Sequence, residues 1–353
     1  MIFCGISAAA LYLSPMITPE IVPLARVYRG ESVEAIHYGS VAVVGADGKL
    51  SHYAGDPYLK TMTRSSIKPF QVMPLLTTGA ADHFGFTPRQ IAIMCGSHNG
   101  TDDHRDVVYG NLERSGCRPT DLRCGTHWPM QMEQAREYPR NGEDCDPLRH
   151  NCSGKHSGFL ALARFLGEPV ERYLDPGSKT QTLVRTALAD MCEYQAGQMP
   201  MGIDGCSAPN YPLPLYNLAL GFKKLANLDA TDSKMMQVLA RVKGAMTEFP
   251  EMVSGEGRFD LDLSRSFPGN LVCKVGAESI EGIGLSDPPL GVAVKIHDGS
   301  WRALGAVCVA VLRQLGLIKD IDDFPYLKRH EMPEVRNVRN TVTGRIVAEV
   351  NLK

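Results

Sequence analysis

The 353-residue sequence lacks an excess of charge of either sign: 37 Lys and Arg residues are balanced by 39 Asp and Glu residues, giving a formal net charge of −2 at pH 7. This nearly neutral net charge gives no electrostatic reason to expect nucleic acid or an anionic membrane as a partner. Aromatic residues are also few, at 7%. They are scattered and not interleaved with Lys and Arg, so the chain offers no platform for stacking bases. We therefore expect neither nucleic acid nor a membrane as a partner.

Long uncharged apolar runs are missing as well. The first residues, Met1–Pro15, are apolar, but this stretch is too short to span a bilayer. No Lys or Arg precedes it, so it also lacks the basic leader of a secretory signal. We expect a cytoplasmic protein whose single domain covers residues 16–353. Residues 1–15 are an extension to which we assign no role.

The ten cysteines include no Cys-x-x-Cys pair, which excludes thioredoxin-like redox and zinc-ribbon sites. Their spacing shows no dense disulfide framework, and without an export signal we expect them to be reduced. Most are expected to be small buried hydrophobic residues.

The order of expected elements predicts an α+β fold. Alternating apolar residues and an Asp47-Gly48 turn favour a hairpin over residues 40–53. Further strands are expected at 271–275, 282–285, 291–296 and 345–350. Helical patterns cover 66–76, 103–114, 156–165, 181–194, 215–225, 233–247 and 301–317. We predict a mainly antiparallel sheet flanked by helices, built from about 20–60 and 259–353, with an inserted helical lobe at about 61–258.

Ser65-Ser66-Ile67-Lys68 is the only Ser-x-x-Lys sequence in the chain. If a helix begins at Ser65 or Ser66, then Ser65 and Lys68 lie one turn apart on one face. The positive end of the helix would oppose protonation of Lys68, so a neutral lysine could take the proton of a nucleophilic Ser65. The alternative is a capping serine followed by a surface lysine.

Two later motifs favour the catalytic interpretation. Ser97-His98-Asn99 has the form Ser-x-Asn, and Lys274-Val275-Gly276 has the form Lys-x-Gly. Together with Ser65-x-x-Lys68 they keep the chain order of the three motifs of penicillin-binding proteins and class A β-lactamases.

A second group of residues could hold a metal ion. Cys152 and Cys206 each lie in a loop rich in Gly and Ser, and Lys155 follows Cys152 by three residues. Two thiolates suit a soft or borderline cation such as zinc, and a neutral lysine can act as a nitrogen ligand. The alternative is a pair of ordinary buried cysteines.

Four runs of sequence resemble the rhizobial-type, thermolabile L-asparaginase II family. They are Arg64-Ser-Ser-Ile-Lys-Pro69, Cys95-Gly-Ser-His-Asn99, His150-Asn-Cys-Ser-Gly-Lys-His156 and Gly202-Ile-Asp-Gly-Cys-Ser-Ala-Pro209. The resemblance covers roughly residues 20–350. It implies a serine β-lactamase-like fold, a homodimer and one zinc ion per chain beside the catalytic serine.

The resemblance also implies roles for individual residues. It makes Ser65 the nucleophile with Lys68 as its base. Ser97 and Lys274 become a second Ser–Lys pair that relays protons. Zinc ligands would be Cys152, Lys155 and Cys206, and Arg64 and Asp204 would shape the substrate site.

The predicted function is hydrolysis of L-asparagine to L-aspartate and ammonia through a serine acyl-enzyme. One alternative is a cytoplasmic β-lactamase-like serine hydrolase or peptidase. The other is a zinc-stabilised binding module without catalytic activity.

Overall fold

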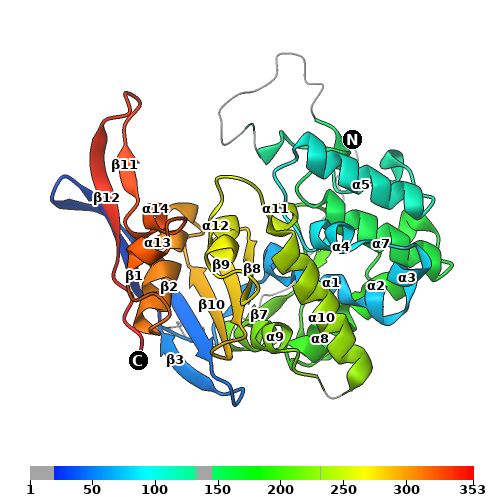
Figure 1. Ribbon diagram of the computed structural model, residues 1–353, viewed down its shortest axis with the longest axis horizontal. Coiled ribbons are helices and arrows are strands. Elements are labelled where there is room, and N and C mark those ends of the chain that lie inside the picture. Colours follow the sequence, from blue (N-terminus) through cyan, green and yellow to red (C-terminus); the bar gives the residue numbers. More distant parts are fainter. Residues whose placement is uncertain (1–19, 131, 133–144, 231) are drawn as a thin grey trace, which may run out of the picture.

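The computed structural model describes residues 20–130, 132, 145–230 and 232–353. Its centre is an eight-stranded antiparallel sheet with the strand order β11-β12-β1-β2-β10-β9-β8, in which β3 also pairs with β2. The strands are β1 (Val22–Arg29), β2 (Ser32–Val44), β3 (Leu50–Ala54), β8 (Leu271–Gly276), β9 (Ile280–Leu285), β10 (Leu290–Ile296), β11 (Glu334–Arg336) and β12 (Val342–Ala348). Strands from the two ends of the chain thus meet in one sheet (Figure 1).

Helices cover the sheet and form a separate lobe beside it. Figure 1 shows this lobe beyond the β8 edge of the sheet, built from helices of the middle of the chain. The helices are α1 (Lys68–Gln71), α2 (Met73–Thr77), α3 (Ala80–His83), α4 (Pro88–Met94), α5 (Asp102–Arg114), α7 (Ser153–Phe165), α8 (Lys179–Met191), α9 (Leu215–Asn227), α10 (Ser233–Glu248), α11 (Pro250–Val253), α12 (Phe259–Ser266), α13 (Leu304–Gln314) and α14 (Lys328–Glu331). Two short pairings, β4 (Lys60–Met62) with β7 (Pro212–Pro214) and β5 (Gly202–Ile203) with β6 (Pro209–Asn210), tie the lobe together.

Two hydrophobic cores lie on opposite faces of the sheet. One packs strand residues against α13, and the other joins the sheet to the helical lobe through α9. The approach of α9 requires a glycine on β9, because a Cβ at Gly282 would lie 2.0 Å from a ring carbon of Phe222. Lys274 of β8 is paired with Gly282. It therefore shares the face of the sheet that meets the lobe.

The fold class predicted from the sequence is confirmed. The hairpin over 40–53 is part of β2 and β3, and the predicted helices from 103 onward are present with shifted ends. The predicted helix over 66–76 is wrong in detail: it is split into a 3-10 turn at Arg64–Ile67, α1 and α2. Pro69 and Pro74 explain the split, because each lacks a backbone N–H and stands in the first turn of a new helix.

Other elements were not predicted individually. α12 is a helix at the start of the region from about 259 that the sequence assigned to the sheet, and the strands β1 and β11 were not predicted. The extension at 1–15 and the expected domain start at Met16 lie outside the described residues. Within those residues, no helix is both long and apolar enough to cross a membrane.

Candidate active site

A pocket of about 290 Å³ opens where the helical lobe meets the sheet. Its walls come from the turn before α1, the segment before α7, the β5–β6 turn and the end of β8. The lining residues are Arg64, Ser65, His127, Met130, His150, Asn151, Cys152, Asp204, Gly205, Cys206 and Ala277. Five of the nine residues predicted for the site line this pocket, although they lie up to 142 positions apart in the sequence.

Ser65 lies in the 3-10 turn Arg64–Ile67, one residue after a strained position. Arg64 has a left-handed backbone with φ of 49°, which costs free energy in a residue other than glycine. The Asn210 side chain stabilises this conformation because its amide bonds to both backbone groups of Arg64. Its Oδ1 accepts from Arg64 N and its Nδ2 donates to Arg64 O, each at 3.0 Å. The side chain of Asn210 therefore holds the turn that presents Ser65 to the pocket.

Lys68 is completely buried behind Ser65 and contacts the second motif. Its Nζ donates to the backbone carbonyl of Gly96 and, at 3.3 Å, to that of Asn151; it lies 3.0 Å from Ser97 Oγ. A neutral amine has two N–H groups and one lone pair. All three oxygens accept from Lys68 Nζ, as they would from an ammonium group. The same partners satisfy a neutral amine when the Ser97 hydroxyl turns to donate to the nitrogen.

The electrostatics of the Lys68 site favour the neutral amine. Burial lowers the pKa of Lys68 below its ordinary value, and the nearby Lys155 lowers it further, against the opposing effect of Cys152. Within the described part of the chain, Ser65 Oγ makes no hydrogen bond. Lys68, which the sequence predicted as the base for Ser65, thus contacts the hydroxyl group of Ser97 instead.

Lys274 is also completely buried, on β8. Its Nζ donates to the backbone carbonyl of Val275 at 2.6 Å. Burial lowers the pKa of Lys274 to about 8, and Lys68 and Arg258 act in the same direction, whereas Asp260 opposes them. The site therefore holds two buried lysines that influence each other, and the pKa of each is lower than that of a free lysine.

The predicted metal ligands lie together at one side of the pocket. Lys155 Nζ donates to Cys206 Sγ at 3.0 Å. A hydrogen bond with Cys152 holds the pKa of the Cys206 thiol well below its ordinary value, and Lys155 adds to this effect while burial opposes it. Burial by itself lowers the pKa of Lys155, but the Cys206 and Cys152 sulfurs outweigh it and raise that pKa above its ordinary value.

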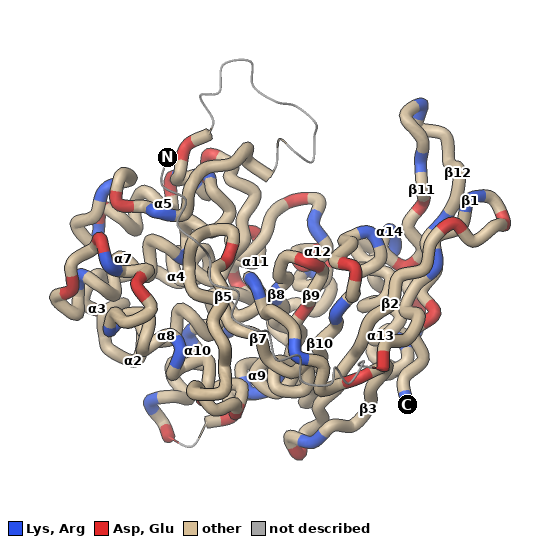
Figure 2. The backbone as a smooth tube through the Cα atoms, turned by 180° about the vertical axis from the view of Figure 1, so that it is seen from behind, with Lys and Arg blue, Asp and Glu red and all other residues tan. Residues whose placement is uncertain are grey.

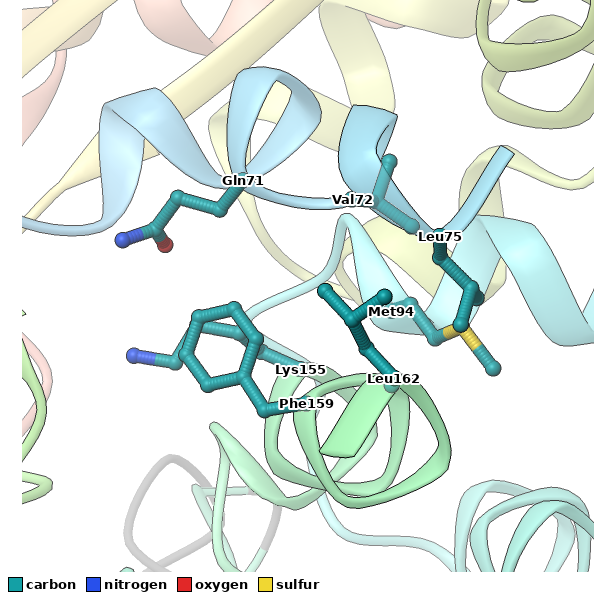
Figure 3. A pocket seen from close by; sticks show the side chains of 8 residues that line it. Gln71, Val72, Leu75, Met94, Lys155, Phe159 and Leu162 are labelled. Carbon is teal, nitrogen blue, oxygen red and sulfur yellow. The ribbon is translucent and has the colours of Figure 1, made fainter. Parts of the chain in front are cut away.

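Apolar residues of the lobe support Lys155 from behind. Its Nζ lies 5.6 Å from the centre of the Phe159 ring. Figure 3 shows the small cavity at this place, with the polar ends of Gln71 and Lys155 pointing to the same side. Among the residues that the structure describes, no group of three or more His, Cys, Asp and Glu side chains converges as a metal site. The two cysteines converge with a lysine instead.

Arg64 and Asp204 form an ion pair at the pocket wall. Arg64 Nε donates to Asp204 Oδ1 at 2.8 Å, and the Gly205 backbone N–H donates to the same oxygen at 2.8 Å. Burial raises the pKa of Asp204, but Lys155 and Arg64 outweigh it and hold the pKa below its ordinary value. The pocket thus contains one fixed cation and one fixed anion near Ser65.

Several residues around the site were not predicted from the sequence. His127 and Met130 line the pocket from a segment without a motif, and His127 Nε2 accepts from the Asn151 backbone N–H at 3.1 Å. Asn151 stands within a motif that was recognised, so its place beside Cys152 could have been inferred. Asn210 carried no signal because its contact with Arg64 spans 146 residues.

Comparisons with solved structures find distant likenesses. A β-lactamase (Mb2281c) from Mycobacterium bovis is 12% identical, with 78% of this chain and 94% of that chain covered and a TM-score of 0.43. Mglu in its native form in 4.3 M NaCl is 16% identical, with 79% and 62% covered and a TM-score of 0.36. Both are too distant to assign a function. A comparison with curated proteins gives no match.

The fold and the pocket define an α+β protein with two buried lysines beside a serine-containing site. The family model for L-asparaginase II matches residues 25–348. This chain belongs to the L-asparaginase II family, which makes it an asparaginase-type amidohydrolase.

Proposed function

We propose that this enzyme hydrolyses L-asparagine to L-aspartate and ammonia through a covalent ester on Ser65. The observation that carries the proposal is the completely buried Lys68, whose pKa burial lowers and whose Nζ lies 3.0 Å from the Ser97 hydroxyl. Membership of the L-asparaginase II family supports the amide substrate. The small, charged pocket around Ser65 suits a small zwitterion.

In the first half of the reaction, Ser65 Oγ attacks the carbon of the side-chain amide. The network of Lys68, Ser97 and Lys274 accepts the serine proton and returns a proton to the leaving nitrogen as the carbon–nitrogen bond breaks. Ammonia leaves, and an aspartyl ester on Ser65 remains. Backbone N–H groups including that of Ser65 would stabilise the oxyanion.

In the second half, water attacks the ester carbonyl. The same network removes a proton from the water and returns one to Ser65 Oγ, so aspartate leaves and the enzyme is regenerated. Because the base acts twice, its neutral form is needed in each turnover.

We propose that Cys152, Lys155 and Cys206 hold a zinc ion. The donor set fits such an ion, since the Cys206 thiol has a lowered pKa and its Sγ lies 3.0 Å from the buried Lys155 Nζ. Sulfur and nitrogen are preferred zinc ligands. When bound, zinc would fix the two cysteine loops and help to orient the substrate. Binding must displace the proton that the cysteines now stabilise on Lys155.

The resemblance noted in the sequence also supports a homodimeric enzyme, and we include the homodimer and the expected cytoplasmic location in the proposal. The rival function is that of a β-lactamase-like hydrolase or peptidase. Nitrocefin turnover measured beside ammonia release from asparagine separates the two. A zinc-stabilised binding module would show neither activity.

The test of the proposed function is ammonia release by the purified protein and two serine variants. Ser65→Ala should remove nearly all asparagine hydrolysis. Ser66→Ala is the matched control: Ser66 is buried and donates to the Thr63 backbone carbonyl at 2.6 Å, away from the pocket. Wild-type turnover in Ser65→Ala would contradict the proposal.

A further inference from the structure

The turn between β8 and β9 forms part of the pocket rim. Ala277 lines the pocket, and the next two residues, Glu278 and Ser279, both have left-handed backbones with φ of 61° and 58°. Lys295 anchors this turn because its Nζ donates to the Glu278 backbone carbonyl and, at 2.6 Å, to that of Ile296. Two consecutive strained residues persist only where surrounding contacts hold them.

The Glu278 side chain lies next to Arg64 and has unused hydrogen-bonding capacity. Its Oε1 is 3.9 Å from Arg64 Nη1, and the side chain is 67% exposed. Within the described residues its carboxylate accepts no hydrogen bond. A Cβ on Gly299 would lie 2.3 Å from Glu278 Oε2, so the glycine leaves room for the carboxylate at this position.

Arg64 consequently stands between two carboxylates with different availability. Asp204 Oδ1 already accepts from Arg64 Nε and from the Gly205 backbone N–H, both at 2.8 Å, and its side chain is only 8% exposed. The carboxylate of Glu278 is therefore more accessible to a substrate than that of Asp204. A substrate with an ammonium and a carboxylate on one carbon needs a cation and an accessible anion side by side.

We propose that Glu278 binds the α-ammonium group of the substrate while Arg64 binds its α-carboxylate. Glu278 then selects α-amino acid amides over amides without the amino group. This assignment rests on the proposed function, since it assumes that asparagine reacts at Ser65. It adds a specificity-determining residue that belongs to none of the sequence motifs.

The test compares two substrates in Glu278→Gln. One is L-asparagine, and the other is succinamate, the same amide without the α-amino group. KM for asparagine should rise about tenfold or more, as expected for the loss of one charge-assisted hydrogen bond, with little change in kcat. The KM for succinamate, or its inhibition constant if it is not hydrolysed, should stay the same.

Glu193→Gln is the matched control. Glu193 also has a left-handed backbone, with φ of 46°, and an exposed side chain in an ion pair with Lys224 at 2.6 Å. Glu193 pairs with Lys224, which does not line the pocket, whereas Glu278 lies beside the pocket residue Arg64. Both substrates should therefore behave with Glu193→Gln as with the wild type. This variant shows what the loss of an exposed, ion-paired glutamate does by itself.

Two results would overturn the assignment to Glu278. An unchanged KM for asparagine would show that Glu278 does not bind the ammonium. An equal loss for both substrates would show that the variant only disturbs the pocket. A wild-type enzyme that releases no ammonia from asparagine would instead overturn the proposed function, and the assignment to Glu278 with it.

Discussion

The charge of Asp260 should control the pH at which the enzyme becomes active. Asp260 is buried on α12, and its carboxylate raises the pKa of Lys274 against the effect of burial. Its Oδ1 accepts from Ser254 Oγ and lies 3.7 Å from Arg258 Nε, whereas Oδ2 has no hydrogen-bond partner among the described residues. Asp260→Asn removes the charge and keeps the shape.

The expected size follows from the pKa of about 8 for Lys274. At pH 7 roughly one Lys274 in eleven is then neutral. Loss of a carboxylate at close range lowers a lysine pKa by about one unit or more, so roughly half of the molecules become neutral at pH 7. If neutral Lys274 is required, kcat/KM at pH 7 should rise about fivefold, with a ceiling of about elevenfold. At pH 9 and above the gain should vanish.

The assay is kcat/KM for asparagine from pH 5.5 to 10, measured as ammonia release. Asp262→Asn is the matched control, because Asp262 is also buried on α12 but pairs with Arg329 and His330, away from Lys274. Only Asp260→Asn should shift the rising part of the profile of kcat/KM against pH to lower pH. An unchanged profile, a shift to higher pH or the same shift in Asp262→Asn would refute the reasoning.

Three further predictions concern the base, the metal and the Arg64 turn. Lys68→Arg should be inactive at every pH in the ammonia assay, because a guanidinium stays protonated; measurable turnover would contradict a lysine base. Elemental analysis should find about one zinc per chain, and Cys206→Ala should lose it. Chelation should raise KM more than it lowers kcat, whereas a metal-free wild type or a complete loss of kcat would count against the site. Asn210→Ala should lower kcat at least tenfold while the circular dichroism spectrum stays native, because the Arg64 backbone loses two hydrogen bonds. A wild-type kcat would show that these two hydrogen bonds are not needed for catalysis.

The sheet could be predicted from the sequence because local patterns determine it. The Asp47-Gly48 turn and the apolar alternation around it are visible in a few residues, and the structure contains the hairpin. The split of the helix at 66–76 was also readable, since Pro69 and Pro74 each stand in the first turn of a helix. β11 was missed because it has three residues, none of them buried.

The site was predictable only where a motif marked it. Ser65, Cys152, Asp204 and Cys206 stand in recognised runs, and all four line the pocket. Contacts between distant segments gave no local pattern. Lys68 contacts Ser97 across 29 residues, and Asn210 bonds to the Arg64 backbone across 146. Glu278 approaches Arg64 from the turn between β8 and β9.

The central claim is that Ser65 forms an aspartyl ester during turnover. The most direct test mixes the enzyme with asparagine, quenches the reaction in acid within its first turnovers, and measures the mass of the intact protein and of its peptides. We predict an added mass of one aspartyl group on the peptide that contains Ser65, absent from Ser65→Ala and present in Ser66→Ala. An adduct on another residue would contradict the account. So would full asparagine turnover by a Ser65→Ala variant that carries no adduct.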